Sequence, residues 1–330
     1  MTSAVTSAVT IPARVRRALA GGEPHSGARF VLAVSGGLDS MALLRAMIRG
    51  GLRGRIAAVA TFDHGTGSAA TDAAALVARV AADSGFRCET GRAPTGTAPT
   101  EAAWRALRHE FLRDVARRQR AEVVTAHTRD DQLETVAMRI LRGAGARGLA
   151  GLDADGRLLR PLLATTRAEL ADFVHAEGVA YVADPSNADR RYFRNRMRLD
   201  LLPALRAATP GFDDWLLGLS RRAAALRRDT EAFVAAVPMR EAPAGGVVID
   251  RVALMGFDQH ELAALWPALA ARAGVTLDRR GTARLARFTE TGSTGGRVQL
   301  SGKHEAVLRR DELALGPLSA PGPSRRKRPR

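Results

Sequence analysis

Cysteine and lysine are nearly missing from this 330-residue chain. The single cysteine, Cys88, excludes a disulfide framework and a zinc site built on several cysteines, and it is typical of a protein of the reducing cytoplasm. Lysine occurs only at Lys303 and Lys327. The nucleotide-binding pattern GxxxxGK[ST] requires a lysine beside its glycines, so that class of phosphate-binding loop is excluded for the glycine bends elsewhere in the chain.

Long apolar runs are also absent. No segment approaches the roughly 20 apolar residues that a membrane-spanning helix needs, and residues 1–22 lack the continuous apolar stretch of a signal peptide. We therefore expect a cytoplasmic protein without a membrane partner. Apolar residues still make up 46% of the chain, enough for a core, whereas aromatic residues make up only 5%, so small aliphatic side chains must do most of the packing.

Acidic residues are too few to balance the basic ones. The chain has 50 lysines and arginines against 34 aspartates and glutamates, a formal net charge of +16. A genome rich in G and C explains the choice of arginine over lysine, but it does not explain the excess of bases over acids. Such an excess favours a polyanionic partner, most simply a nucleic acid.

The first 145 residues alternate between strand-like and helix-like patterns. The strand-like segments are 28–34, 55–62, 86–90 and 121–127, and the helix-like segments are 39–49, 72–85, 100–120 and 130–143. This alternation predicts an α/β fold: a doubly wound parallel sheet, Rossmann-like, with helices on both faces. Sheets of this kind bind ligands at the carboxyl ends of their strands, where the motifs described below lie.

The pattern changes after about residue 205. Residues 210–237 resemble one long helix, and residues 247–317 form a small mixed segment with a strand-like VVID, two helical stretches and a hairpin-like RVQLSGKHEAVLRR. We predict a first domain over 1–205, a helical linker over 206–237 and a small C-terminal domain over 238–317. The Pro-rich basic tail, 318–330, is expected to be disordered.

A glycine bend joins the first predicted strand to the first predicted helix, in the sequence VLAVSGGLDSMALL. Gly36 and Gly37 allow the backbone to approach a ligand without a Cβ atom in the way. The amide groups there and the positive end of the following helix form an anion site, to which Ser35 and Ser40 add hydroxyl donors.

Asp39 is the unexpected member of this bend, because a carboxylate beside a phosphate is repelled. A divalent cation between the two removes the repulsion, and Mg²⁺ is the usual cation with phosphate oxygens. The bend therefore indicates a pyrophosphate and metal site. The alternative is an ordinary strand–turn–helix bend in which the aspartate caps the helix.

SGGLDS at residues 35–40 resembles the SGGxDS signature of the PP-loop, or N-type, ATP pyrophosphatases, which split ATP into AMP and pyrophosphate while adenylating a substrate oxygen. TAHTRDDQLET, RPLL, DPSN and RNRMR follow in the order found in the tRNA(Ile)-lysidine synthase family. The resemblance covers residues 30–205 and makes 1–205 the catalytic domain. Residues 247–316 resemble the small C-terminal domain of that family more loosely.

The resemblance implies a reaction. ATP adenylates the C2 oxygen of the wobble cytidine of a CAU-anticodon tRNA(Ile), and the amine of L-lysine then displaces AMP. The products are lysidine, AMP and pyrophosphate, and the tRNA changes from reading AUG to reading AUA and from methionine to isoleucine identity. The implied substrates are ATP with Mg²⁺, L-lysine and the tRNA, and a homodimer is left open.

The resemblance also implies an ATP-binding set. It consists of Ser35, Gly36, Gly37, Leu38, Asp39, Ser40 and His64. Two departures from the family pattern affect substrate binding rather than the glycine bend. The second strand ends in DHGTG, without the arginine that the family carries, and Thr128 replaces the second histidine expected after TAH.

Three acids open the helix after the fourth predicted strand. Offsets of three and four place Glu134 on the same helical face as Asp130 and Asp131. These acids either cap the helix or bind a second Mg²⁺ or the ammonium groups of lysine. We predict that they act in catalysis with Asp39, and that Asp39 and Asp130 bind magnesium. His127 precedes them as a base, a positioning group or a structural residue.

Two sets of basic residues are predicted to contact tRNA. Arg105 and Arg108 share a helical face with Glu101. The alternative is that this face is a solvated surface stabilised by salt bridges. Arg194, Asn195 and Arg198 belong to the densest basic motif of the first domain, and guanidinium groups suit phosphate oxygens; the alternative is a basic helix surface. The C-terminal domain either grips the tRNA body or is a structural cap.

Two other functions remain open from the sequence. A tRNA 2-thiolation enzyme uses the same ATP chemistry, but such enzymes typically need paired cysteines, and Cys88 stands alone. A non-catalytic tRNA-binding module requires a decayed loop, whereas residues 35–40 are intact.

Overall fold

The computed structural model describes residues 10–20, 27–65, 67–98, 100–154, 158–242 and 245–318, so all but Leu318 of the predicted basic tail lies outside the described residues. The chain divides into two compact units. The first runs to Leu219 without residues 143–150, and the second contains residues 143–150 and everything from Ser220 onward.

A five-stranded parallel sheet organises the first unit, with the order β3-β2-β1-β4-β5. The strands are β1 (Phe30–Ala33), β2 (Ile56–Asp63), β3 (Cys88–Arg92), β4 (Glu122–Val124) and β5 (Leu158–Leu159). The predicted α/β class and parallel sheet are confirmed. Because β1 pairs with β2 on one side and β4 on the other, the strand order reverses at β1, which is where such sheets open a crevice.

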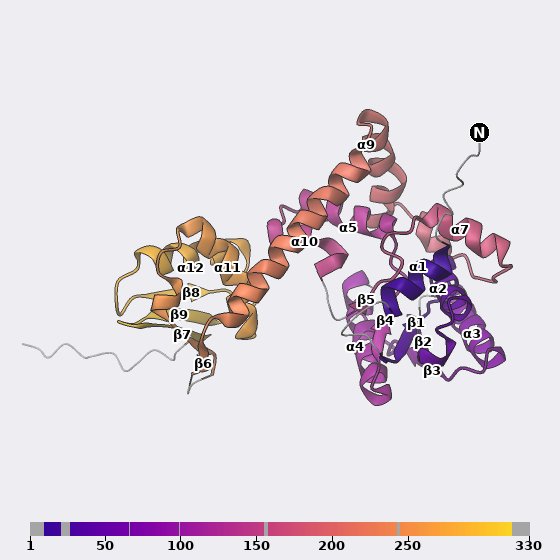
Figure 1. The fold of residues 1–330 in the computed structure, drawn as a ribbon, viewed down its shortest axis with the longest axis horizontal. Helices are drawn as coiled ribbons and strands as arrows, with labels where there is room; N and C mark the ends of the chain where they lie inside the picture. Colours follow the sequence, from indigo (N-terminus) through magenta and orange to yellow (C-terminus); the bar gives the residue numbers. More distant parts are fainter. Residues whose placement is uncertain are drawn as a thin grey trace, which may run out of the picture. The chain divides into compact units, whose positions relative to one another are not determined.

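Helices cover both faces of this sheet. Phe30 and Leu32 of β1 point into a core formed with α1 (Ile11–Ala20), α2 (Leu38–Arg49), α3 (Ser68–Asp83) and α7 (Arg167–Ala176). Val31 lies between them in sequence and points to the opposite face, where it packs against Leu112 and Val115 of α4 (Glu101–Gln119). Figure 1 shows α4 on one side of the strands and α2 and α3 on the other.

A separate apolar cluster fixes the helix that carries the acids. Leu133 and Val136 of α5 (Arg129–Leu141) pack against Met197, Leu202 and Leu216. These partners come from a π-helical segment, η4 (Met197–Leu201), from α9 (Leu202–Ala208) and from the start of α10 (Phe212–Ala236). The packing holds the preceding short helix, α8 (Phe193–Arg196), beside the first turns of α5, although about sixty residues separate them along the chain.

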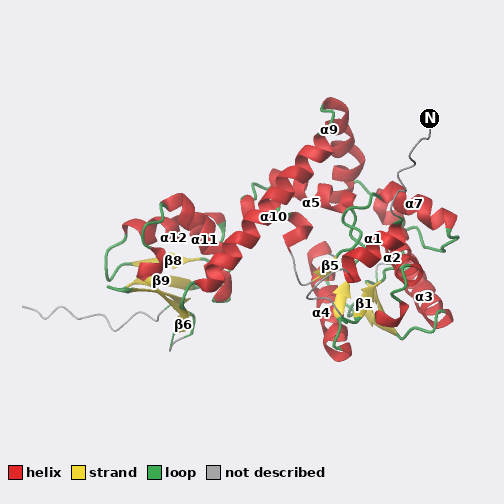
Figure 2. Ribbon diagram, in the orientation of Figure 1, coloured by secondary structure: helices red, strands yellow, loops and turns green. Residues whose placement is uncertain are grey.

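The second unit is an antiparallel sheet with two helices over one side of its strands (Figure 2). The strands in spatial order are β6 (Met239–Glu241), β7 (Val247–Asp250), β10 (Glu312–Pro317), β9 (His304–Leu308) and β8 (Arg297–Leu300). Helices α11 (Gln259–Arg272) and α12 (Arg279–Thr291) pack onto them through a core that includes Trp266 and Leu285. The predicted VVID strand, both helices and the hairpin are present; β6 and β10 were not predicted.

The remaining short elements are α6 (Ala146–Leu149) and the 3-10 turns η1 (Arg53–Arg55), η2 (Gly151–Ala154), η3 (Pro185–Ala188) and η5 (Arg251–Leu254). Within the described ranges, none of the helices combines the length with the hydropathy that a bilayer span requires.

Candidate active site

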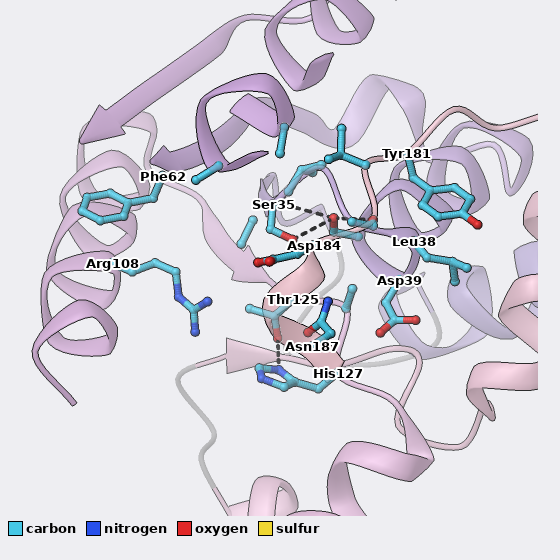
Figure 3. A pocket seen from close by; sticks show the side chains of 18 of the residues that line it. Ser35, Leu38, Asp39, Phe62, Arg108, Thr125, His127, Tyr181, Asp184 and Asn187 are labelled. Carbon is cyan, nitrogen blue, oxygen red and sulfur yellow. Dashed lines mark hydrogen bonds between the residues drawn. The ribbon is translucent and has the colours of Figure 1, made fainter. Parts of the chain in front are cut away.

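A cavity of about 710 Å³ opens at the carboxyl ends of β1, β2 and β4. Figure 3 shows Arg108 and Asp39 extending from different sides of it, with Thr125 and His127 between them. The predicted site residues that line it are Ser35, Gly37, Leu38, Asp39, Ser40, His64, Arg108, Asp131, Arg194, Asn195 and Arg198. Gly36, Arg105, Asp130 and Glu134 are not part of the lining.

The glycine bend has the backbone that its sequence predicts. Gly36 has a φ of +82°, and a Cβ atom there would lie 2.7 Å from the carbonyl oxygen of Ala73 on α3. The Val182 amide donates to the Gly36 carbonyl at 2.9 Å. Only glycine meets both the positive φ and the close approach, so the bend is fixed between α3 and the segment at Val182.

Helix α2 starts from this bend without a side-chain cap. Gly37 occupies the N-cap position and makes no side-chain cap hydrogen bond, whereas Thr100, Thr128 and Thr166 cap α4, α5 and α7. The alternative that Asp39 caps α2 is therefore wrong. The first-turn amides and the positive end of the helix dipole are left for an anion in the cavity.

The two serines of the bend bond to each other and to the backbone. Ser40 Oγ accepts from the Ser35 amide at 3.1 Å and donates to the Gly37 carbonyl at 2.9 Å. Ser35 Oγ lies 3.2 Å from Ser40 Oγ. These bonds hold the bend closed, and the predicted donation from both hydroxyls to phosphate stays a prediction.

Asp39 presents one engaged and one unpaired carboxylate oxygen. Its Oδ2 lies 3.3 Å from Arg167 Nη2, while its Oδ1 is buried and has no hydrogen-bond partner among the described residues. Burial raises the pKa of Asp39 above its usual value, against the opposing effect of Arg167. An unpaired buried oxygen is unfavourable unless a ligand supplies the partner.

Asp131 and Glu134 are held by arginines that follow much later in the chain. Asp131 Oδ2 accepts from the Thr128 amide at 2.8 Å, and its Oδ1 lies 2.7 Å from Arg194 Nη2. Glu134, whose side chain is 1% exposed, lies 2.7 Å from Arg194 Nε and 2.6 Å from Arg198 Nε. Burial alone raises the pKa of Asp131, but Arg194 and the Thr128 amide outweigh it, so that pKa lies below its usual value.

Arg167 is a charged residue of the site that sequence reasoning missed. It is the first residue of α7, and its guanidinium lies 3.3 Å from Asp39, 3.5 Å from Asp131 and 3.6 Å from Glu134. A capping box formed by Thr166 and Glu169 marks the start of α7 and was the available sequence signal. We refer to Asp39, Asp131, Glu134, Arg167, Arg194 and Arg198 as the acid–arginine cluster.

Two of the three histidines that line the cavity, His64 and His127, have pKa values below the usual one. Burial lowers the pKa of His127 to about 3, and its Nδ1 lies 2.8 Å from Thr125 Oγ1. Burial, with the nearby Arg108, also lowers the pKa of His64, whose Nδ1 is buried without a partner among the described residues. The His64 ring lies 5.2 Å from Phe62 and 6.2 Å from Trp104, centroid to centroid, so it belongs to an aromatic wall.

The Asn195 side chain lines the cavity but is already hydrogen-bonded to the backbone, and Arg105 lies outside the lining. The Asn195 amide donates to the carbonyls of Ser186 and Asp189 at 2.8 and 2.9 Å, which fixes the DPSN turn. Arg105 is exposed on α4, outside the lining. Contact of either residue with tRNA stays a prediction.

The fit of magnesium to this cavity rests on Asp39. Among the described residues, no group of three or more histidine, cysteine, aspartate or glutamate side chains forms a metal site. Mg²⁺ needs less, because it commonly binds one or two carboxylates together with phosphate oxygens and water. Asp39, with its unpaired oxygen beside the uncapped helix, fits this role. Asp130 accepts from the Arg167 amide at 2.8 Å, so its predicted metal role stays a prediction.

Comparisons with known proteins agree with this geometry. The PP-loop domain family matches residues 10–205. The chain is 45% identical over 193 residues to a tRNA(Ile)-lysidine synthase of Novosphingobium aromaticivorans, covering 55% of this chain and 58% of the relative. It is 40% identical over 255 residues to the tRNA(Ile)-lysidine synthase of Salinispora arenicola, covering 72% and 75%.

The likeness has limits in length and in structure. The chain spans 58%, 43% and 38% of the lengths of three similar relatives, all tRNA(Ile)-lysidine synthases. A solved U34-tRNA thiolase of Methanococcus maripaludis, with its [4Fe-4S] cluster, has a TM-score of 0.53 and 15% identity, covering 66% of this chain and 78% of the thiolase. That likeness concerns the fold alone.

Proposed function

The chain belongs to the tRNA(Ile)-lysidine synthase family of PP-loop proteins, and we propose that it ligates L-lysine to C2 of the wobble cytidine of a CAU-anticodon tRNA(Ile) at the expense of ATP. In the first step the cytidine O2 attacks the α-phosphorus, and pyrophosphate leaves. In the second step the lysine amine attacks C2, AMP leaves and the amine releases a proton. The products are lysidine, AMP and pyrophosphate.

The uncapped amino end of α2 is the observation that carries this proposal. It follows the Gly36 bend, faces the cavity and has Asp39 in its first turn. The amides bind and orient the triphosphate of ATP, and Asp39 Oδ1 supplies a ligand for Mg²⁺. The metal, when bound, offsets the phosphate charge. The neutral His64 and Phe62 offer a wall for the nucleoside.

One of the acids on α5, Asp131, lines the same cavity at the end of β4. Glu134 is not part of the lining and shares Arg194 with Asp131 in the acid–arginine cluster. Carboxylates at this place suit the ammonium group of lysine, and the neutral His127 adds no positive charge that would repel it. Arg108 enters from α4 and suits a phosphate of the nucleotide or the anticodon loop. An anticodon loop releases its wobble base into a cavity more easily than a duplex does.

A 2-thiolation function is the rival with related chemistry, and the cysteine content disfavours it. Cys88 is the sole cysteine of the chain, it lies on β3, and it is not part of the cavity lining. Persulfide or cluster chemistry at the cavity therefore lacks a sulfur ligand.

Incubation with ATP, Mg²⁺, radiolabelled L-lysine and unmodified CAU-anticodon tRNA tests the proposal. Label is expected in the RNA, with one AMP released for each lysine incorporated. A matched tRNA with uridine at the wobble position is the control and should stay unlabelled. Pyrophosphate exchange into ATP that needs tRNA but no lysine would place adenylation first. Absence of label from the cytidine tRNA would remove the proposed function.

A further inference from the structure

The carboxylates of the acid–arginine cluster are already matched by cations. Asp39 lies 3.3 Å from Arg167, Asp131 lies 2.7 Å from Arg194, and Glu134 lies 2.6 Å from Arg198. Three acids thus face three guanidinium groups. A cationic ligand cannot simply be added to such a set, because like charges at short range in a partly buried site repel strongly. An arginine must leave an acid when a metal or an ammonium group arrives.

Arg167 is the arginine that is held least tightly. Arg194 and Arg198 approach their acids to 2.6–2.7 Å, whereas the Arg167 guanidinium stays 3.3–3.6 Å from three different acids. Hydrogen bonds weaken quickly over this range of distance. The guanidinium also lines the cavity. It can therefore change partners at lower cost than the other two.

The backbone of Arg167 is fixed while its side chain is not. The Arg167 amide donates to Asp130 Oδ2 at 2.8 Å, and the residue is the first of the capped helix α7. The nearby oxygen Asp39 Oδ1 is buried without a partner among the described residues, so the pair of Asp39 and Arg167 is incomplete. A metal ion would complete the coordination of Asp39, and the triphosphate at the end of α2 would offer the displaced guanidinium a stronger partner.

We propose that Arg167 is a placeholder cation: its guanidinium holds the place of the divalent ion on Asp39, and it transfers to the triphosphate when the metal–nucleotide complex binds. There it stabilises the charge of the departing pyrophosphate. No proton moves on the arginine, and the bonds that form and break are those of the adenylation step. The inference rests on the proposed function, and it assigns a residue that contacts the leaving group.

Metal binding without nucleotide tests the first half of this exchange. Mn²⁺, observed by electron paramagnetic resonance, replaces Mg²⁺ as the probe. Arg167→Gln leaves Asp39 without its cation, so Mn²⁺ should bind at least about tenfold more tightly than to the wild type, the effect of a modest screened charge interaction. Arg167→Lys keeps the charge and should leave Mn²⁺ affinity close to that of the wild type. Arg49→Gln, which removes a surface arginine paired with Glu177, is the matched control.

Nucleotide binding tests the second half. The same Arg167→Gln protein should bind the magnesium complex of a non-hydrolysable ATP analogue about tenfold more weakly, because the glutamine amide cannot replace a charged bond to phosphate. An unchanged thermal midpoint shows that the fold is intact. Opposite changes in metal and nucleotide affinity support the proposal. A structural role predicts that both fall together, and that result, or an unchanged Mn²⁺ affinity, overturns it.

These outcomes are separable from failure of the proposed function. If the wild type incorporates lysine while Arg167→Gln leaves Mn²⁺ affinity unchanged, the placeholder role is wrong and the ligation stands. If the wild type incorporates no lysine, the ligation is wrong, and the Mn²⁺ measurement still decides whether Arg167 holds a cation's place.

Discussion

At the scale of single residues, the important question is which cation faces each carboxylate. Asp39, Asp131 and Glu134 face arginines in this structure, yet only Asp39 keeps a buried oxygen without a partner among the described residues. The three acids therefore differ in role although they share one cluster. Asp39 is suited to a transient ligand, whereas Glu134, with two short ion pairs, is suited to holding Arg194 and Arg198 in place.

Asp39→Asn tests the metal role. The amide keeps the shape of the side chain but loses the charge that holds a divalent ion. We expect tRNA-dependent pyrophosphate exchange to fall at least about a hundredfold, the usual effect of removing one electrostatic contact to a transition state. tRNA affinity, measured by filter binding, should be nearly unchanged. Turnover equal to that of the wild type contradicts the assignment.

Arg194→Ala tests the ion pairs behind the cavity. It removes partners of Asp131 and of the buried Glu134, and loss of one partner from a buried charged bond costs about 1–3 kcal/mol. Urea unfolding of Arg194→Ala, Glu134→Gln and the double variant should give a coupling energy well above zero. Arg191→Ala is the control, since Arg191 pairs with Asp189 at the surface and should have little effect. If the losses of unfolding free energy in the two single variants simply add in the double variant, Arg194 and Glu134 are not energetically coupled.

His127 should make the fold sensitive to mild acid. Its pKa is about 3 in the folded protein against 6.5 for an ordinary histidine, so between these values the unfolded chain binds more protons. Stability should therefore fall as the pH drops below 6.5, and this group should have no effect above it. The loss of unfolding free energy from pH 7 to pH 5 should be smaller in His127→Gln than in the wild type. His260→Gln, at an exposed position on α11, should lose as much as the wild type.

At the scale of elements, hydrophobic periodicity was sufficient for the regular parts of the fold. The apolar run of β1 and the amphipathic pattern of α2 predicted both elements and the glycine bend between them. Periodicity was not sufficient for β5, which has only two residues, and the ten-residue α7 was not predicted either. The Thr166–Glu169 capping box was the signal for α7, and it went unused.

The acids of the site were predictable, but their partners were not. The spacing of Asp131 and Glu134 places them on one helical face from sequence alone. Their pairing with Arg194 and Arg198 depends on the packing of α5 against Met197 and Leu202, a tertiary contact that no local pattern encodes. Arg167 was missed for the same reason, because its contacts reach back to residues far earlier in the chain.

The glycine bend gives a prediction about an element rather than a contact. Gly36→Ala combines a positive φ with a Cβ atom 2.7 Å from the Ala73 carbonyl oxygen, and the φ alone costs about 1–3 kcal/mol. Gly37→Ala is the matched control, because its Cβ atom would meet only Ser35 Oγ, at 3.7 Å. Urea unfolding should show a large loss for the first variant and a small one for the second. Equal losses would mean that α3 does not fix the bend.

At the scale of the whole molecule, part of the net charge of +16 lies on one helix of the second unit. Arg280, Arg284 and Arg287 are exposed on α12, and offsets of four and seven place them on one helical face. We propose that this face contacts tRNA phosphates, in line with the predicted binding of the tRNA body by the C-terminal domain.

Replacing these three arginines by glutamine should weaken tRNA binding and flatten its salt dependence. For every phosphate that is no longer neutralised, the slope of log affinity against log salt should fall by about 0.7–0.9. Nucleotide binding should not change, since α12 does not line the cavity. The control removes the same charge from the first unit by changing Arg16, Arg17 and Arg49 to glutamine. An equal change in slope for both triple variants means that only net charge matters.

The late position of the arginines along the chain governs the order in which the site matures during synthesis. β1, α2 and α5 are complete by residue 141, but Arg194 and Arg198 emerge from the ribosome more than fifty residues later. A nascent chain stalled near residue 160 can pair its first four strands. Its Asp131 and Glu134 carboxylates must stay hydrated, because the arginines that pair with them have not yet been synthesised. Closing the intervening loop is then a late step in folding, and the crevice becomes competent only after the sheet beneath it has formed.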